Sequence, residues 1–95
     1  MTILRMEHPI QDFASWKAAF DSDPIGRERS GVRRYTILQP RDDPQYIMID
    51  LEFDDAEAAE KMAAALQKLW QRVQTEGLIG SQQLRMVEVI ESKTY

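Results

Sequence analysis

A run of alternating side chains between residues 45 and 53 constrains the fold of this chain more than any other feature. Every second residue there is large and apolar, and most of the residues between them are polar or charged. The apolar set is Ile47, Ile49, Leu51 and Phe53, and the other set is Tyr46, Met48, Asp50 and Glu52. Because successive side chains of a strand point to opposite faces, this pattern predicts a strand with only one face in the core.

Three further strands and two helices are expected along the chain. The strands are predicted at 2–8, 32–39 and 84–90, where apolar and β-branched residues are frequent. In the first of them the alternation sets one group, Leu4, Met6 and His8, against another, Ile3, Arg5 and Glu7.

The helices are predicted from apolar stripes. Phe13, Trp16 and Phe20 recur at spacings of three and four, which indicates a helix from about Asp12 to Asp21. A longer stripe predicts a helix from Ala56 to near Gly77, before a loop that contains Gly80. Its members are Ala59, Met62, Ala63, Leu66, Leu69, Trp70 and Val73. Asp54 and Glu57 are expected to cap its start as a variant of the capping box.

The order of these elements predicts the architecture. Strand, helix, strand, strand, helix, strand is the split βαβ arrangement of a ferredoxin-like α+β domain over residues 1–95. Right-handed crossovers then place both helices on one face of a four-stranded antiparallel sheet, with the first and third strands in the middle. The other face stays bare in a monomer, and the pattern leaves open whether it meets water or a second sheet.

Composition excludes several classes of function. Twelve basic and sixteen acidic residues are mixed throughout and give a net charge of −4, so there is no basic stripe for nucleic acid. The chain has no cysteine, which rules out disulfides and thiolate chemistry, and its one histidine is too little for a metal site. No stretch is apolar enough for a signal core or a membrane span, so a cytoplasmic protein is expected.

Four stretches resemble the dimeric α/β-barrel superfamily, in which two ferredoxin-like subunits pack sheet against sheet. They are Glu-His-Pro-Ile-Gln-Asp-Phe-Ala-Ser-Trp-Lys-Ala-Ala-Phe from Glu7, Ser-Gly-Val-Arg-Arg-Tyr from Ser30, Asp-Asp-Pro-Gln-Tyr-Ile-Met-Ile-Asp-Leu-Glu-Phe-Asp from Asp42 and Val-Glu-Val-Ile-Glu from Val87. The resemblance covers nearly the whole chain. Together the four stretches are similar to those of a group of short bacterial proteins sometimes labelled cyclase. It implies a homodimer that forms an α/β barrel.

The activities that this resemblance implies are diverse, because fold alone does not select among them. Members carry out cofactor-free oxygenation of aromatic polyketides, polyketide cyclisation or haem degradation, and others are stress-related proteins without known activity. The haem-degrading members use Asn, Trp and His, with the His on the second helix. This chain has no Asn and no His in that helix, so haem degradation is not expected. The cyclase members rely on histidine with tyrosine.

The candidate site residues follow from where relatives bind ligands, between the helices and the sheet. His8 is the natural general acid or base, and Tyr35 is a candidate hydrogen-bond donor. Trp16, Phe20 and Trp70 are candidates to line a pocket. Each also has a purely structural interpretation, as a packed strand-end histidine or as aromatic core.

The candidate dimer interface lies on the bare face of the predicted sheet. Its residues are Arg5, Tyr46, Met48, Asp50 and Glu52. Asp50 and Glu52 share a face, which suggests either an acid–base pair or carboxylates neutralised by Arg5, by the partner sheet, or by Arg33 or Arg34. Neutralisation is the simpler explanation.

Two functions remain open from the sequence. One is a homodimeric small-molecule-binding or accessory module without chemistry. The other is a cofactor-independent enzyme, cyclase-like or monooxygenase-like, that acts on a hydrophobic aromatic substrate with His8 as base and Tyr35 as donor. Neither requires a cofactor. A cavity reached by both side chains favours the enzyme, and a solid core that buries both favours the module.

Overall fold

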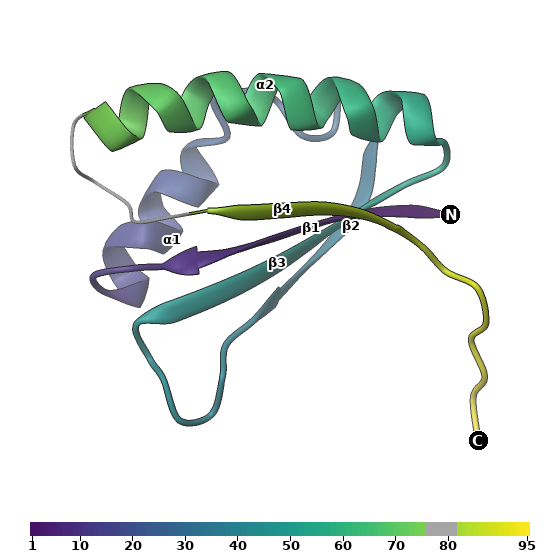
Figure 1. Cartoon of the computed structure of the whole chain (residues 1–95), viewed down its shortest axis with the longest axis horizontal. Coiled ribbons are helices and arrows are strands. Elements are labelled where there is room, and N and C mark those ends of the chain that lie inside the picture. The colour runs from purple at the N-terminus through teal and green to yellow at the C-terminus, as the bar shows by residue number, and fades with distance from the viewer. Residues whose placement is uncertain (76–81) are drawn as a thin grey trace.

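The computed structural model describes the backbone of residues 1–75 and 82–95 and the side chains of this part except 70 and 72–75. The elements follow the predicted order of strand, helix, strand, strand, helix, strand (Figure 1). They are β1 (Thr2–Pro9), α1 (Phe13–Ser22), β2 (Val32–Leu38), β3 (Tyr46–Phe53), α2 (Ala56–Thr75) and β4 (Gln83–Glu88). The ferredoxin-like prediction is therefore confirmed.

The four strands form one antiparallel sheet in the order β2-β3-β1-β4, with β1 and β3 in the middle as predicted. Leu4 lies opposite Leu51 and Met6 opposite Ile49, so the apolar sets of the two central strands share a face. The two helices lie over this face (Figure 1). We call it the covered face, and we call the opposite side of the sheet the open face.

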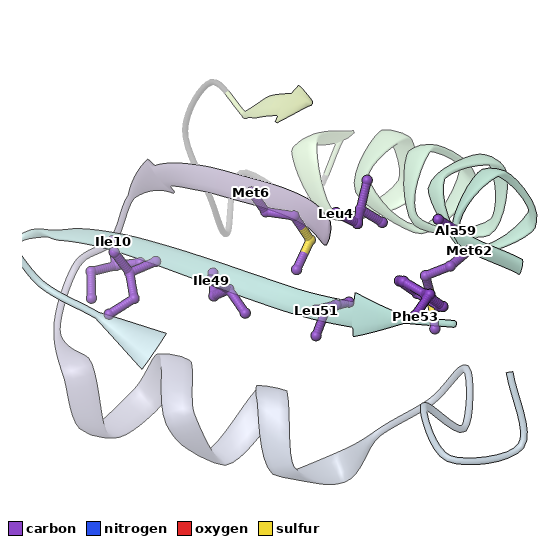
Figure 2. Packing of buried hydrophobic residues seen from close by; sticks show 9 residues of the cluster. Leu4, Met6, Ile10, Ile49, Leu51, Phe53, Ala59 and Met62 are labelled. Atoms are coloured by element: carbon purple, nitrogen blue, oxygen red, sulfur yellow. The ribbon is translucent and has the colours of Figure 1, made fainter. Parts of the chain in front are cut away.

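The core fills the space between the covered face and the helices. It consists of Leu4, Met6, Ile10, Ile47, Ile49, Leu51, Phe53, Ala59 and Met62, all of which are nearly inaccessible to water. Figure 2 shows how the strand side chains meet Ala59 and Met62, which reach the core from α2. The alternation in β1 and β3 thus predicted correctly which residues are buried under the helices.

Helix α1 is capped by an aspartate at each end. The Asp12 carboxylate accepts a hydrogen bond from the Ser15 N–H at 2.8 Å and caps the N-terminus. At the other end Asp23 adopts a left-handed conformation, with φ of 48°, and its N–H donates to the Phe20 carbonyl. No residue of α1 is fully buried, but Trp16 and Phe20 pack against the core. This short helix is therefore held by its aromatic side chains.

The cap of α2 differs from the prediction. Asp55, and not Asp54, accepts the hydrogen bond from the Ala58 N–H, at 2.8 Å. Asp54 instead pairs with Arg33 at 2.7 Å. The two aspartates are adjacent in sequence, and the helix start at Ala56 places the capping position on the second of them.

The end of β4 also differs from the prediction of a strand over 84–90. The strand is Gln83–Glu88, because Glu88 pairs with Thr2, the first residue of its only neighbour β1. Residues 89–95 continue as an extended arm that leads away from the sheet (Figure 1), and its Ile90 is 91% exposed. Helix α2 is described to Thr75, so Gly77 and Gly80 lie outside the described residues. Within the described part, no helix has the length and apolarity to cross a bilayer.

Candidate functional site

A cavity of about 160 Å³ lies between the helices and the covered face. Among the described residues, the sheet contributes four side chains, each helix contributes three, and the connection after α1 closes one side. The lining residues are Met6, His8, Ile49 and Leu51 from the sheet, Trp16, Ala19 and Phe20 from α1, Met62, Leu66 and Leu69 from α2, and Asp23, Pro24, Ile25 and Arg27 from the connection. The wall is therefore apolar apart from His8, Asp23 and Arg27.

Aromatic rings form the α1 side of this cavity. Trp16 and Phe20 are four residues apart, so they share one face of the helix. Their rings stack at 26° with centroids 5.1 Å apart, and the ring of His8 lies 6.4 Å from that of Trp16. Three of the predicted site residues, from a strand end and a helix, thus meet at one place.

His8 is held in one orientation at the end of β1. It is only 4% exposed, and its Nδ1 lies 2.9 Å from the Pro9 carbonyl oxygen. Since a carbonyl only accepts, Nδ1 carries the proton and Nε2 is the basic nitrogen of the neutral ring. Burial lowers the pKa of His8, and the hydrogen bond to Pro9 opposes this only in part. His8 is therefore a neutral acceptor or base at physiological pH.

Arg27 is a further cavity residue, which the sequence analysis missed. Its guanidinium carbon lies 3.8 Å from the centre of the Phe20 ring, and its Nη1 donates to the Phe20 carbonyl at 2.9 Å. The Asp23 carboxylate accepts from the Arg27 backbone N–H at 2.9 Å and lies 3.5 Å from Nη1. The residue belongs to a polar connection without periodicity, so nothing in the sequence marked it as different from its neighbours Arg29 and Arg33.

Tyr35 and Trp70 do not join this group in the structure. Tyr35 lies on the covered side of β2, where its ring meets Phe20 edge-on at 5.0 Å. It is 43% exposed and is not among the described residues that line the cavity. The side chain of Trp70 lies outside the described residues. The structure therefore brings His8 to the cavity and leaves Tyr35 beside it.

The open face carries ion pairs instead of an acid–base dyad. Arg5 binds both oxygens of Asp50, at 2.7 and 2.8 Å, and Arg34 binds Glu52 at 2.6 Å. The hydrogen bond to Asp50 raises the pKa of Arg5, which keeps the guanidinium charged. Neutralisation by arginine is thus confirmed for both carboxylates, with Arg34 and not Arg33 on Glu52.

Tyr46, also on the open face, donates a hydrogen bond to Glu7 at 2.7 Å, and this bond raises the pKa of its phenol. Met48 lies half-buried on the same face of β3. Among the described residues, no group of three or more His, Asp or Glu side chains is placed to hold a metal ion.

Proteins of known structure share this fold along almost the whole chain. A variant of the cofactor-independent oxygenase SnoaB from Streptomyces nogalater superposes with a TM-score of 0.73 at 15% identity, over 96% of this chain and 94% of that one. A Shewanella oneidensis protein superposes with a TM-score of 0.66 at 23% identity, over 90% of this chain and 88% of that one.

A dimeric ferredoxin-like protein from an uncultured marine organism superposes with a TM-score of 0.62 at 13% identity, over the full length of both chains. No family model and no curated protein matches the chain. The likeness therefore shows the fold, which is the one that the sequence resemblance predicted.

Proposed function

We propose that this chain is a homodimeric module that binds a small hydrophobic or aromatic molecule in the cavity between its helices and its sheet. The observation that carries the proposal is the cavity itself. The described part of its wall is almost wholly apolar, two stacked rings form one side, and the few polar groups there come from three residues. Pockets of this composition are typical of small-molecule sites, where burial supplies affinity and a few polar groups fix orientation.

The open face supports pairing with a second copy. Arg5, Tyr46, Met48, Asp50 and Glu52 form its centre, where every charged group is already paired within the chain. Paired charges lose less on leaving water than free ones, so such a surface suits an interface better than unpaired carboxylates would. The similarity to a dimeric ferredoxin-like protein supports pairing with a second copy.

Charges near the edge of the open face fit a two-fold arrangement. Arg85 of β4 lies on this face opposite Arg5 and makes no ion pair with any described residue. Glu7 lies two residues after Arg5 on β1, on the same face. Among the described residues, only the Tyr46 hydroxyl donates a side-chain hydrogen bond to its carboxylate. In a symmetric dimer, we expect Arg85 of each copy to pair with Glu7 of the other, which would make the surface self-complementary.

Sedimentation of a charge variant tests the dimer. We expect the wild type to sediment as a dimer at micromolar concentration and Met48→Asp to sediment as a monomer with an unchanged circular dichroism spectrum. Gln67→Asp, on the exposed side of α2, is the matched control and keeps the dimer. A wild type that stays monomeric at every concentration contradicts the pairing.

Methionine methyl NMR tests the cavity. Met6 and Met62 line it, whereas Met48 lies on the open face and serves as an internal control. With methyl-labelled methionine, we expect indole to shift the Met6 and Met62 signals and leave that of Met48 unchanged. Ala19→Trp, which places an indole on the α1 side of the cavity, is expected to abolish the shifts. Shifts confined to Met48, or no shifts at all, contradict a ligand in this place.

A cofactor-independent enzyme is the second candidate, and His8 favours it. A neutral imidazole in an apolar cavity is placed to take a proton from a bound aromatic substrate. The likeness to a cofactor-independent oxygenase supports the same class, with monooxygenase-like or cyclase-like chemistry as the alternatives. Tyr35, expected as the donor, lies beside the cavity wall. Substrate binding retained by His8→Gln together with loss of turnover supports this candidate, and unchanged turnover overturns it.

A further inference from the structure

We propose that the cavity selects a ligand with a single aromatic ring and a carboxylate, whose oxygens bind the guanidinium of Arg27. This inference rests on the proposed binding function and goes beyond it in naming the class of ligand. It draws on three observations of the cavity: its volume, the rings along one side, and the donors that Arg27 leaves unused.

The volume limits the size of what is enclosed. An apolar cavity of about 150 Å³ in an engineered protein binds benzene, and the present cavity measures about 160 Å³. It therefore has room for one six-membered ring with a short substituent. A molecule of three or more fused rings would leave most of its surface outside the wall, so burial would contribute little to its binding.

The wall favours a flat ring. Trp16 and Phe20 stack closely on the α1 side, and the side chains of Ile49, Leu51 and Met62 line the cavity from the sheet and α2. A planar ring fits between an aromatic wall and an aliphatic one with contacts on both of its faces. Aromatic contacts of this kind add to the gain from burial alone.

Arg27 supplies the charge that the ligand has to match. Only its Nη1 is engaged, by the Phe20 carbonyl and more distantly by Asp23. None of the described residues accepts a hydrogen bond from Nε or Nη2. The guanidinium carbon lies 3.8 Å from the centre of the Phe20 ring and 5.3 Å from that of Tyr35, so the aromatic contacts use its flat faces. The edge that carries Nε and Nη2 can then bind a carboxylate through two parallel hydrogen bonds.

The nearby carboxylate of Asp23 does not fully cancel the attraction between Arg27 and a ligand carboxylate. Both of its carboxylate oxygens already accept from the Arg27 backbone N–H, at 2.9 and 3.2 Å, so their orientation is fixed by the turn. The remaining polar group of the wall, His8, is neutral. The cation of Arg27 is therefore the one charge with unused donors that the described wall offers to a ligand.

Two probes of matched shape test this selection. Phenylacetate and phenylacetamide share the ring and differ in charge, and both are titrated into the full-length protein with the Met6 and Met62 methyl signals as readout. We expect the wild type to bind the acid about tenfold more tightly than the amide, as for a charge-assisted hydrogen bond. Arg27→Gln is expected to remove this preference and to keep the affinity for the amide. Arg33 does not line the cavity, so Arg33→Gln is expected to keep the preference for the acid.

The outcomes separate this inference from the proposed function. If neither probe shifts the two methyl signals, the cavity does not bind small aromatic molecules and the function itself fails. If both probes bind the wild type equally, or if phenethylamine binds more tightly than the acid, the function stands and the selection by Arg27 is wrong. The wild-type ratio decides this even where Arg27→Gln is poorly folded, and Arg27→Lys, which keeps the charge, should retain part of the preference.

Discussion

The two faces of the sheet exclude water by different means. On the covered face, Leu4 and Ile49 are buried because the helices pack over them. On the open face, Asp50 and Glu52 are only 9% and 7% exposed, yet their cover is the arginine side chains that bind them. The low exposure of the residues on the two faces thus has two origins. On the covered face it comes from packing of the helices, and on the open face from pairing with arginine side chains. Each face should respond to a different kind of substitution.

Removing volume from the covered face has the largest expected effect. Phe53 is fully buried at the end of β3, away from the cavity lining. Phe53→Ala is expected to lower the free energy of unfolding by ~3–5 kcal/mol, through lost burial and the void left behind. Urea unfolding followed by circular dichroism measures this. Leu38→Ala, a truncation of a half-exposed side chain on the open face, is the control and should cost far less. Similar losses for the two would erase the distinction between the faces.

Removing charge from the open face has the next largest effect. Arg5→Met leaves the Asp50 carboxylate, whose side chain is 12% exposed, without its cation. We expect a loss of about 1–3 kcal/mol in the free energy of unfolding, because a buried acceptor is left unsatisfied. Replacing both partners, as Arg5→Met with Asp50→Leu, should recover most of it.

The pair between Arg33 and Asp54 is the matched control for this experiment. Its N–O distance is also 2.7 Å, but both side chains are about two-thirds exposed, at 70% and 66%. Arg33→Met is expected to cost about 0–1 kcal/mol, as surface pairs do. All variants are compared at a concentration where sedimentation shows the same species. If Arg5→Met and Arg33→Met lowered the free energy of unfolding equally, burial would not strengthen the ion pair on the open face.

The covered face could be predicted from the sequence, and the cover of the open face only in part. Alternation fixes which side chains of β1 and β3 share a face, because the period of a strand is two. It says nothing about which arginine reaches which carboxylate, since Arg33 and Arg34 are neighbours on β2. The irregularity in pairing between Val32 and Arg34 decides this, by placing Arg34 opposite Glu52.

Element ends and site membership were predicted less well, for related reasons. The apolar residues Val89 and Ile90 continue the pattern of β4, but the ladder ends with Glu88 opposite Thr2. After one further hydrogen bond, from the Val89 N–H to the Met1 carbonyl at 3.3 Å, the chain continues as the arm. His8 was identified because it is the only histidine, and Trp16 because it belongs to an apolar helical stripe; the structure brings both to the cavity. Arg27 was missed because loops carry no periodic signal, and only the fold brings it onto Phe20.

The cap of α2 gives a smaller effect that sharpens the account of the covered face. The helix that closes this face depends on Asp55 for its first hydrogen bond. Asp55→Ala is expected to lower the free energy of unfolding by ~1 kcal/mol, because the Ala58 N–H loses its acceptor. Asp54→Ala, one residue earlier, is the control and should stay within about 0.5 kcal/mol of the wild type. A larger loss of stability for Asp54→Ala than for Asp55→Ala would support Asp54 as the capping residue, as the sequence predicted.

The smallest expected effect concerns His8, the one titratable side chain that is buried on the covered face in the part of the chain the structure describes. Asp50 and Glu52 on the open face are paired with arginines, whereas His8 is kept neutral by burial, which lowers its pKa. At a pH above about 6.5, the value of an unfolded histidine, both folded and unfolded states carry a neutral ring. As the pH falls below this value the unfolded state takes up the proton first, so the stability falls until the pKa of the folded state is passed. We therefore expect the stability of the wild type relative to His8→Gln to decrease on going from about pH 7.5 to about pH 5. Because His8 is the only histidine, its ring signals in NMR report its pKa directly and provide the control. A relative stability that rises on acidification would mean that His8 is held as a cation, and the covered face would then use charge as the open face does.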